Sequence, residues 1–278
     1  MPLFWLAAVS LAAALGICAA FGGFGSLQWL WALPVSFVGC FLALVLAGFA
    51  FLLYLCRRVD QNVPQEDDDP FYRRVTNLVI GAALPFLRIH VKKSGLEKVP
   101  TDQRFLLVCN HTNNSDPIIL LYAMPKAQLA FISKRENSTM FVIGPMMHKL
   151  LCQLINREND REALKTILRC IQIIREDKAS IAVFPEGGIH EDKKFHHFRP
   201  GVFKIAQKTN VPIVVCTIQN TRQIFENLKK LKKTDIHLHL VDVISPEQYA
   251  GMSTIELGNM VYEIMARDLG PENISNEA

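Results

Sequence analysis

The sequence predicts an α/β domain with a mixed, largely parallel sheet flanked by helices, preceded by an N-terminal two-helix membrane anchor. Two observations predict the domain. Short, continuous apolar runs are typical of buried strands, and they alternate with longer segments whose apolar residues recur at helical spacing. A third observation predicts the anchor: residues 1–56 contain no Asp, Glu, Lys or Arg, whereas the rest of the chain has an ordinary charge content.

The uncharged N-terminal stretch is too long for one membrane span and fits two spans of about 20 residues each. We expect the spans at Leu3–Phe24 and Trp29–Cys56, with a glycine-containing break at residues 22–26. The alternative for the first span is a cleaved signal peptide, but the N-terminus lacks the basic residues that such a signal needs. Basic residues follow the second span, beginning with Arg57 and Arg58, and predict that the domain faces the cytoplasm.

The remaining chain is expected to divide into two parts. Residues 57–88 are expected to form an acidic linker and then an amphipathic helix on the membrane surface, which Pro85 ends or kinks. Residues 89–278 are expected to form the main domain, with no internal repeat. The net charge of +4, without a basic run interleaved with aromatics, argues against nucleic-acid binding. The seven cysteines lie in apolar runs without a CxxC pair, which is typical of buried, reduced thiols.

Within the main domain, the alternation of patterns predicts five strands and five helices. Asp116 is expected to cap the helix that Pro117 begins. Gly144 and Pro145 are expected to break or bend the helix that contains them. The strands are expected at residues 105–109, 129–133, 180–184, 211–218 and 236–244, and the helices at 117–124, 136–149, 160–176, 200–209 and 253–269.

The sharpest local signal is the segment Asn110–Asp116, which follows a predicted buried strand and leads into a helix. A histidine five residues before an aspartate can turn back to meet it across a tight loop. The carboxylate of Asp116 then holds one ring nitrogen of His111 and leaves the other free to take a proton from a substrate hydroxyl. The alternative is that Asp116 only caps the helix and His111 is an ordinary loop residue, because short motifs are prone to chance matches.

Two weaker signals involve a glycine pair and an arginine. Gly187 and Gly188 follow another predicted strand, so their backbone can approach a ligand and cradle an anion, while Glu186 can bind a substrate hydroxyl. The alternative is a turn with an exposed glutamate. Arg157 follows an apolar run and suits bidentate phosphate binding, although most arginines are solvated surface residues.

Together these segments resemble the four motifs of the glycerolipid acyltransferase family, whose members include 1-acyl-sn-glycerol-3-phosphate (lysophosphatidic acid) acyltransferase. The resemblance covers about residues 90–220, in both order and spacing. It is carried by Asn110–Asp116, by the segment that ends at Asn156-Arg157, by Phe184–Gly187 and by the apolar run Val211–Val215.

The resemblance implies acyl transfer from acyl-CoA or acyl carrier protein to the free hydroxyl of a lysophospholipid, without a metal or redox cofactor. It implies that His111 is the general base and that Asp116 orients it. Membrane lipids and the acyl donor are therefore the expected partners. The substrate-binding residues are expected to be Arg157, Phe184, Pro185, Glu186, Gly187, Gly188, Lys134 and Arg199.

The sequence departs from the family pattern at two motifs. The third motif usually continues Gly-Thr-Arg-Ser, but Ile189 stands where the arginine is usual. The second motif has Leu151 where glycine is usual and Asn156 where aspartate is common. The acceptor therefore stays open between lysophosphatidic acid, another lysophospholipid and a non-phosphate lyso-lipid. Candidates to replace the missing arginine are Arg199, His190, His196 and His197.

Two other classes of function are alternatives to this interpretation. A metal site could be built from His190, Glu191, Asp192, His196 and His197, but its spacing is irregular, and Lys193 and Lys194 favour a solvated loop. The second alternative is a non-enzymatic membrane scaffold with the same fold. The presence of His111 and Asp116 favours an enzyme over such a scaffold. The basic run Leu228–Lys233 is interpreted as solvated or membrane-facing; docking of an acidic carrier protein there is a hypothesis.

Overall fold

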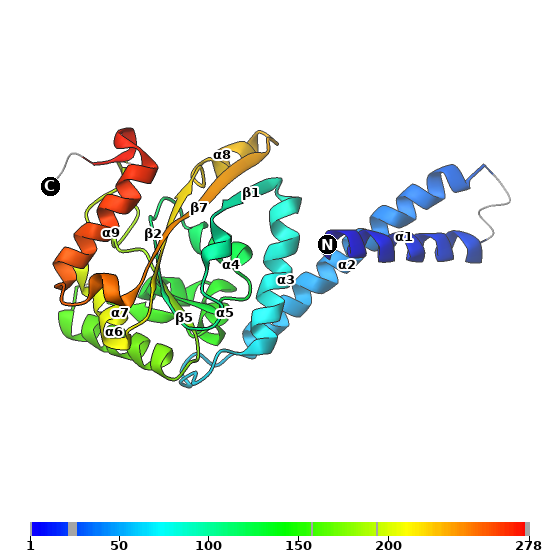
Figure 1. The fold of residues 1–278 in the computed structure, drawn as a ribbon. Coiled ribbons are helices and arrows are strands. Elements are labelled where there is room, and N and C mark those ends of the chain that lie inside the picture. The colour runs from blue at the N-terminus through cyan, green and yellow to red at the C-terminus, as the bar shows by residue number, and fades with distance from the viewer. Residues whose placement is uncertain (1, 22–26, 157, 193, 276–278) are drawn as a thin grey trace.

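The computed structural model describes residues 2–21, 27–156, 158–192 and 194–275. An α/β domain makes up most of it, and two N-terminal helices project from one side (Figure 1). These helices are α1 (Pro2–Ala20) and α2 (Trp29–Arg57), which pack against each other. The predicted break at residues 22–26 lies outside the described residues.

The sheet has seven strands in the described part of the chain, in the order β1-β7-β6-β2-β5-β3-β4. All neighbouring pairs are parallel except β6 and β7, which are antiparallel. The predicted mixed, largely parallel sheet is therefore confirmed. The strands are β1 (Ile89–Ser94), β2 (Leu106–Cys109), β3 (Leu129–Lys134), β4 (Gln153–Ile155), β5 (Ser180–Val183), β6 (Ile213–Gln219) and β7 (Thr234–Ile244).

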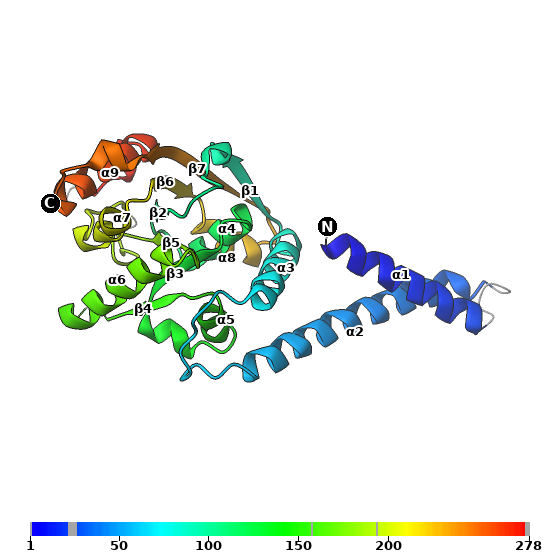
Figure 2. The same cartoon turned by 60° about the horizontal axis from the view of Figure 1, so that its bottom comes forward.

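Helices cover both faces of the sheet (Figure 2). Side chains alternate along a strand, so in β2 Leu106 and Val108 face one core while Leu107 and Cys109 face the other. Both cores are apolar, which explains why the central strands are continuous apolar runs. The first core includes α6 (Asp160–Arg175), α7 (Lys204–Thr209) and α9 (Thr254–Leu269), and the second includes α3 (Pro70–Phe86), α4 (Asp116–Ala123) and α8 (Gln223–Lys229).

Three elements were not predicted, each for a physical reason. Strand β1 lies at an edge of the sheet and contains two lysines, so it lacks a continuous apolar pattern. Strand β4 has only three residues, and α8 only seven. The helix predicted over 136–149 is instead a 3₁₀ helix (Arg135–Thr139) followed by α5 (Ile143–Lys149). Further 3₁₀ helices are Leu96–Lys98, Pro200–Phe203, Pro246–Tyr249 and Pro271–Asn273.

The parallel strands β2, β5 and β6 have the same direction, so the loops after them meet at one edge of the sheet. The first loop is residues 110–115, the second is residues 184–199 and the third is residues 220–222. Ligands of α/β proteins bind at this edge because the loops there converge. The sheet topology therefore places the sequence motifs that follow β2 and β5 next to each other.

Helices α1 and α2 are long and apolar enough to cross a bilayer, and little of either is buried in the domain. A core helix of a soluble protein would be mostly buried, and these helices are not. An N-terminal signal sequence can have the same length and hydropathy. Helix α2 has 29 residues, so it is about 44 Å long at a rise of about 1.5 Å per residue. Two apolar N-terminal helices are thus confirmed, and they suggest association with a membrane.

Helix α3 packs on the domain and near the anchor. Asp69 is its N-cap residue, and the Asp69 carboxylate accepts hydrogen bonds from the backbone N–H groups of Phe71 and Tyr72. One side buries Ile80 and Leu84 in the second core. The other side exposes apolar residues, as expected for an amphipathic helix, and the helix continues past Pro85 by one residue. Its contact with a membrane surface stays a prediction.

A buried ion pair joins the acidic linker to α3. Arg73 donates to both carboxylate oxygens of Asp68, at 2.8 and 2.6 Å, and to the backbone oxygen of Leu129 at 3.1 Å. Asp68 is 8% exposed and Arg73 is 6% exposed. The pair therefore joins the linker, α3 and the start of β3, and Arg73 is not available to lipid headgroups.

Substitution of Asp68→Ala should strongly destabilise the protein. It leaves the Arg73 guanidinium buried without its partner, which costs about 3–5 kcal/mol in comparable buried pairs. Asp67→Ala is the matched control, because Asp67 is exposed and pairs with Lys178 at 3.4 Å, an interaction of about 0–1 kcal/mol. Denaturant unfolding in detergent measures both changes in free energy of unfolding, and equal changes would contradict the assignment.

Candidate active site

The residues of the first motif meet as predicted from their spacing. Nδ1 of His111 lies 3.0 Å from Oδ2 of Asp116. The same oxygen accepts the backbone N–H groups of Thr112 at 2.7 Å and Asn113 at 2.8 Å. Asp116 is fully buried, whereas the His111 side chain is 16% exposed. One buried carboxylate thus closes the loop and holds the imidazole ring at its exposed end.

The expectation that Asp116 caps the helix is wrong. Ser115 occupies the N-cap position of α4 and makes no capping bond with its side chain, and Asp116 is the first residue of the helix. The Asp116 carboxylate turns back to the loop because the backbone N–H groups of Thr112 and Asn113 point at it. A negative charge in the first turn is also favoured by the helix dipole.

The hydrogen bond to Asp116 selects the tautomer of His111. A carboxylate only accepts hydrogen bonds, so the Nδ1 atom of His111 carries the proton. The lone pair of Nε2 is then free to take a proton from a substrate. When it does, the carboxylate stabilises the imidazolium ion. The geometry therefore suits general base catalysis on a hydroxyl nucleophile.

The second motif contacts the first directly. The ring of Phe184 stacks on the imidazole of His111, with centroids 4.2 Å apart and planes inclined by 20°. Phe184 in turn stacks on Phe131 of β3, at 6.1 Å. The aromatic ring therefore supports one face of the imidazole, while Asp116 determines its rotation.

Glu186 links the loops after β2 and β5. Its Oε1 accepts the backbone N–H of His111 at 2.6 Å, and its Oε2 accepts the backbone N–H of His196 at 3.1 Å. The residue is 6% exposed. Burial raises the pKa of Glu186 to about 8, although the two backbone N–H groups oppose that rise. Glu186 thus holds the backbone of His111, a role that its sequence position did not reveal.

Asn110 joins the loop after β2 to β6. Its side-chain amide donates to the backbone oxygen of Ile218 at 3.0 Å and accepts from the backbone N–H of the same residue at 2.7 Å. Asn110 is 3% exposed. An aspartate here would leave the Ile218 oxygen without a donor. The amide therefore completes the hydrogen bonding between strand ends next to His111.

The glycine pair has a steric role at its first member. Gly187 has a φ of 84°, in the left-handed region that favours glycine. A Cβ atom there would also lie 2.7 Å from Nε of Arg199. Arg199 donates its backbone N–H to the oxygen of Pro185 at 2.9 Å. The structure therefore brings Arg199 close to Gly187. Arg199 is a candidate to replace the arginine that the family motif usually has at the position of Ile189.

The other expected binding residues are less closely placed. Gly188 follows in the same loop and is partly exposed. Lys134 is exposed at the end of β3, which β5 separates from β2. Arg157 lies outside the described residues. Binding roles for these residues stay predictions.

The histidines of the loop after β5 form a stack. The rings of His190 and His196 lie 3.7 Å apart, and Nε2 of His196 is 2.8 Å from Oδ2 of Asp192. His197 stacks instead on Tyr262 of α9, at 4.5 Å. Within the part of the chain that is described, no three His, Cys, Asp or Glu side chains are arranged to hold a metal ion.

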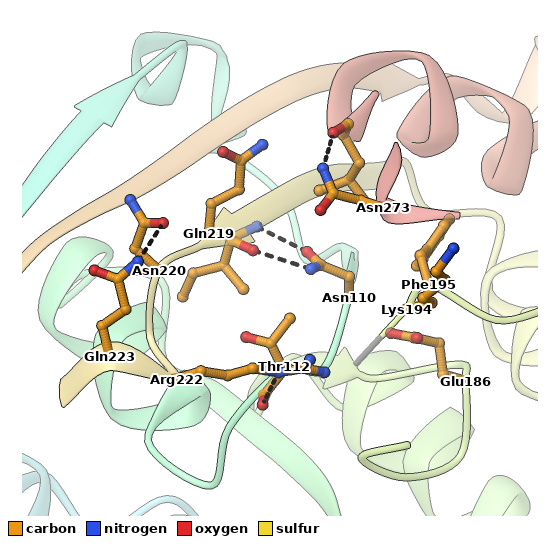
Figure 3. Close-up of a pocket in the computed structure, with 12 residues that line it drawn as sticks. Asn110, Thr112, Glu186, Lys194, Phe195, Gln219, Asn220, Arg222, Gln223 and Asn273 are labelled. Carbon is orange, nitrogen blue, oxygen red and sulfur yellow. Dashed lines mark hydrogen bonds between the residues drawn. The ribbon is translucent and has the colours of Figure 1, made fainter. Parts of the chain in front are cut away.

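Two polar residues after β6 were missed by sequence reasoning. The hydroxyl of Thr221 lies 2.6 Å from that of Thr112, and Nε of Arg222 donates to the backbone oxygen of Thr112 at 2.9 Å. Figure 3 shows Arg222 extending below Thr112 in the direction of Glu186. Their position after a buried strand is the signal that could have found them, since β6 ends at the same edge as β2.

Glu186 should make thermal stability depend on pH. Its folded pKa of about 8 lies above the usual value of about 4.3, so between these values the folded state keeps a proton that the unfolded state has lost. The stability that Glu186 contributes is thus complete at low pH and falls as the pH rises through about 8. As the pH rises from about 4.3 to about 8, the thermal midpoint in detergent should fall more for the wild type than for Glu186→Gln. Parallel curves of thermal midpoint against pH would refute the raised pKa of Glu186.

Part of the chain is similar to known acyltransferases. Residues 90–219 match the family model described as Acyltransferase. Over 144 residues the chain is 34% identical to a probable 1-acyl-sn-glycerol-3-phosphate acyltransferase of Mycoplasma pneumoniae, covering 50% of this chain and 53% of that protein. It is 27% identical to a protein of the same description from Mycoplasma genitalium, covering 65% of this chain and 71% of the relative.

A solved structure has the same fold. The 1-acyl-sn-glycerophosphate acyltransferase PlsC from Thermotoga maritima aligns with a TM-score of 0.58 at 22% identity, covering 79% of this chain and 86% of that one. The match with the Mycoplasma pneumoniae relative spans about half of that relative's length. The matched segment contains His111, Asp116 and Glu186. Residues 90–219 are therefore similar to the acyltransferase domain that the family model describes.

Proposed function

We propose that the protein transfers an acyl group from an acyl thioester to the free hydroxyl of 1-acyl-sn-glycerol-3-phosphate, giving phosphatidic acid. The observation that carries the proposal is the contact of 3.0 Å between His111 and the buried Asp116. The acceptor is taken from the descriptions of the relatives. Another lyso-lipid is the alternative acceptor, because Ile189 stands where the family motif usually has an arginine.

In the proposed reaction, Nε2 of His111 takes the proton of the acceptor hydroxyl as its oxygen attacks the thioester carbonyl carbon. The C–S bond breaks, and the imidazolium returns the proton to the departing thiolate, so the enzyme ends in its starting state. Asp116 stabilises the imidazolium between these two steps. The donor is acyl-CoA or acyl carrier protein, and the reaction so written requires no metal or redox cofactor.

Substitution of His111→Ala should lower the rate of acyl transfer by about 10²–10⁴-fold, the usual contribution of a proton-transfer residue. The assay uses purified protein, long-chain acyl-CoA and a panel of lyso-lipid acceptors, with acyl carrier protein as a second donor. His90→Ala is the control, because His90 is exposed on the edge strand β1. Equal product from wild type and His111→Ala would remove His111 from the mechanism.

We also propose that α1 and α2 anchor the domain in a membrane with the domain on the cytoplasmic side. What supports this is the exposed apolar surface of both helices, followed by Arg57 and Arg58. An anchored enzyme reaches an acceptor that already lies in the bilayer without extracting it.

A reporter fused to the C-terminus tests this orientation. A cytoplasm-specific reporter should be active and a reporter that works only after export should be silent, because basic residues after α2 hold the domain inside. The reverse pattern would overturn the orientation and leave the reaction untouched.

A further inference from the structure

A polar cavity of about 210 Å³ lies beside the loop after β2, on the side of β6. It is several times larger than the space that one water molecule occupies, about 30 Å³. Figure 3 shows the residues around it. Those that matter here are Asn110, Thr112, Glu186, Lys194, Arg222 and Asn273.

Two cationic side chains line this cavity without a carboxylate partner. Among the described residues, no Asp or Glu oxygen lies within 4.0 Å of the side-chain nitrogens of Lys194 or Arg222. Arg222 is half-buried; burial lowers the pKa of its guanidinium, and the more distant carboxylates of Glu186, Asp116 and Asp192 oppose this change. A partly desolvated cation without a carboxylate in direct contact is stabilised further by an anion that binds it.

The orientation of Arg222 is determined by one hydrogen bond. Its Nε donates to the backbone oxygen of Thr112, the residue after His111. The planar guanidinium still has the donors of its two terminal nitrogens, which are suited to two oxygens of a phosphate group. An anion held there would lie next to the loop that carries the candidate base, because Asn110 and Thr112 line the cavity.

The acidic residue in the cavity does not oppose an anion strongly. Both oxygens of Glu186 are occupied by backbone N–H groups. Burial also raises the pKa of Glu186 to about 8, which reduces its negative charge near neutral pH. The two cations therefore dominate the charge of the cavity.

We propose that Arg222, together with Lys194, binds a substrate phosphate group in this cavity. This phosphate site adds a substrate-binding element to the proposed function, and it rests on that function only for the identity of the substrate. The phosphate belongs either to the headgroup of the acceptor or to the acyl donor. Arg222 would thus both position the loop through Thr112 and select substrates that carry a phosphate.

Binding can be tested without catalysis, with glycerol 3-phosphate as the probe. The thermal midpoint of the wild type in detergent should rise with probe concentration, and the rise should be lost in Arg222→Gln and reduced in Lys194→Gln. Arg175→Gln is the matched control, since Arg175 also donates to a backbone oxygen, that of Lys208 at 2.8 Å, but on an exposed surface. A full rise in Arg222→Gln, or none in the wild type, would overturn the site. If Arg222→Gln does not fold, Lys194→Gln decides.

Kinetics then identify which substrate carries the phosphate. With lysophosphatidic acid, Arg222→Gln should raise the acceptor KM by about 10–100-fold, the range for a lost charged hydrogen bond, and leave the KM for a monoacylglycerol unchanged. A higher KM for acyl-CoA but not for acyl-pantetheine would assign the phosphate to the donor. Equal losses of activity with every substrate would mean that Arg222 only positions the loop, and would overturn the proposal. A wild type inactive with all substrates would refute the proposed function, while the binding test still decides the site.

Discussion

The candidate site depends on the buried carboxylate of Asp116. Its Oδ2 accepts three hydrogen bonds, two from backbone N–H groups and one from the imidazole of His111. A buried charge is costly unless it is hydrogen-bonded in this way. A change in the loop conformation would therefore leave the carboxylate without these hydrogen bonds or expose it to solvent. The same bonds that stabilise the charge therefore give His111 a single orientation and a single tautomer.

Two further buried polar residues hold this loop against its neighbours. Glu186 connects it to the loop after β5, and Asn110 connects it to the end of β6. Phe184 contributes packing, because its ring lies against the imidazole. The position of His111 thus results from contacts with neighbouring loops as well as from its own sequence. Such preorganisation is what catalysis by His111 would require.

The two sides of this loop differ in chemistry. On the side of β5, a second cavity is lined mostly by apolar residues, among them Ile132, Ile167 and Phe184. On the side of β6, the cavity contains Arg222 and Lys194. A substrate with an apolar chain and a charged group would therefore find an environment suited to each part. The two apolar N-terminal helices are consistent with such a substrate, since they suggest association with a membrane.

The sequence by itself determined the fold class, the two apolar helices and the meeting of His111 with Asp116. These depend on local patterns: hydrophobic periodicity, absence of charge, and a spacing of five residues across one loop. Only the tertiary structure decided the partners of Glu186, Asn110 and Arg222. The partners on other loops and strands are His111 for Glu186, Ile218 for Asn110 and Thr112 for Arg222, which lie 75, 108 and 110 residues away along the chain. They meet because β2 pairs in parallel with both β5 and β6. Strand order arises from packing of the whole domain, so no local pattern could specify it.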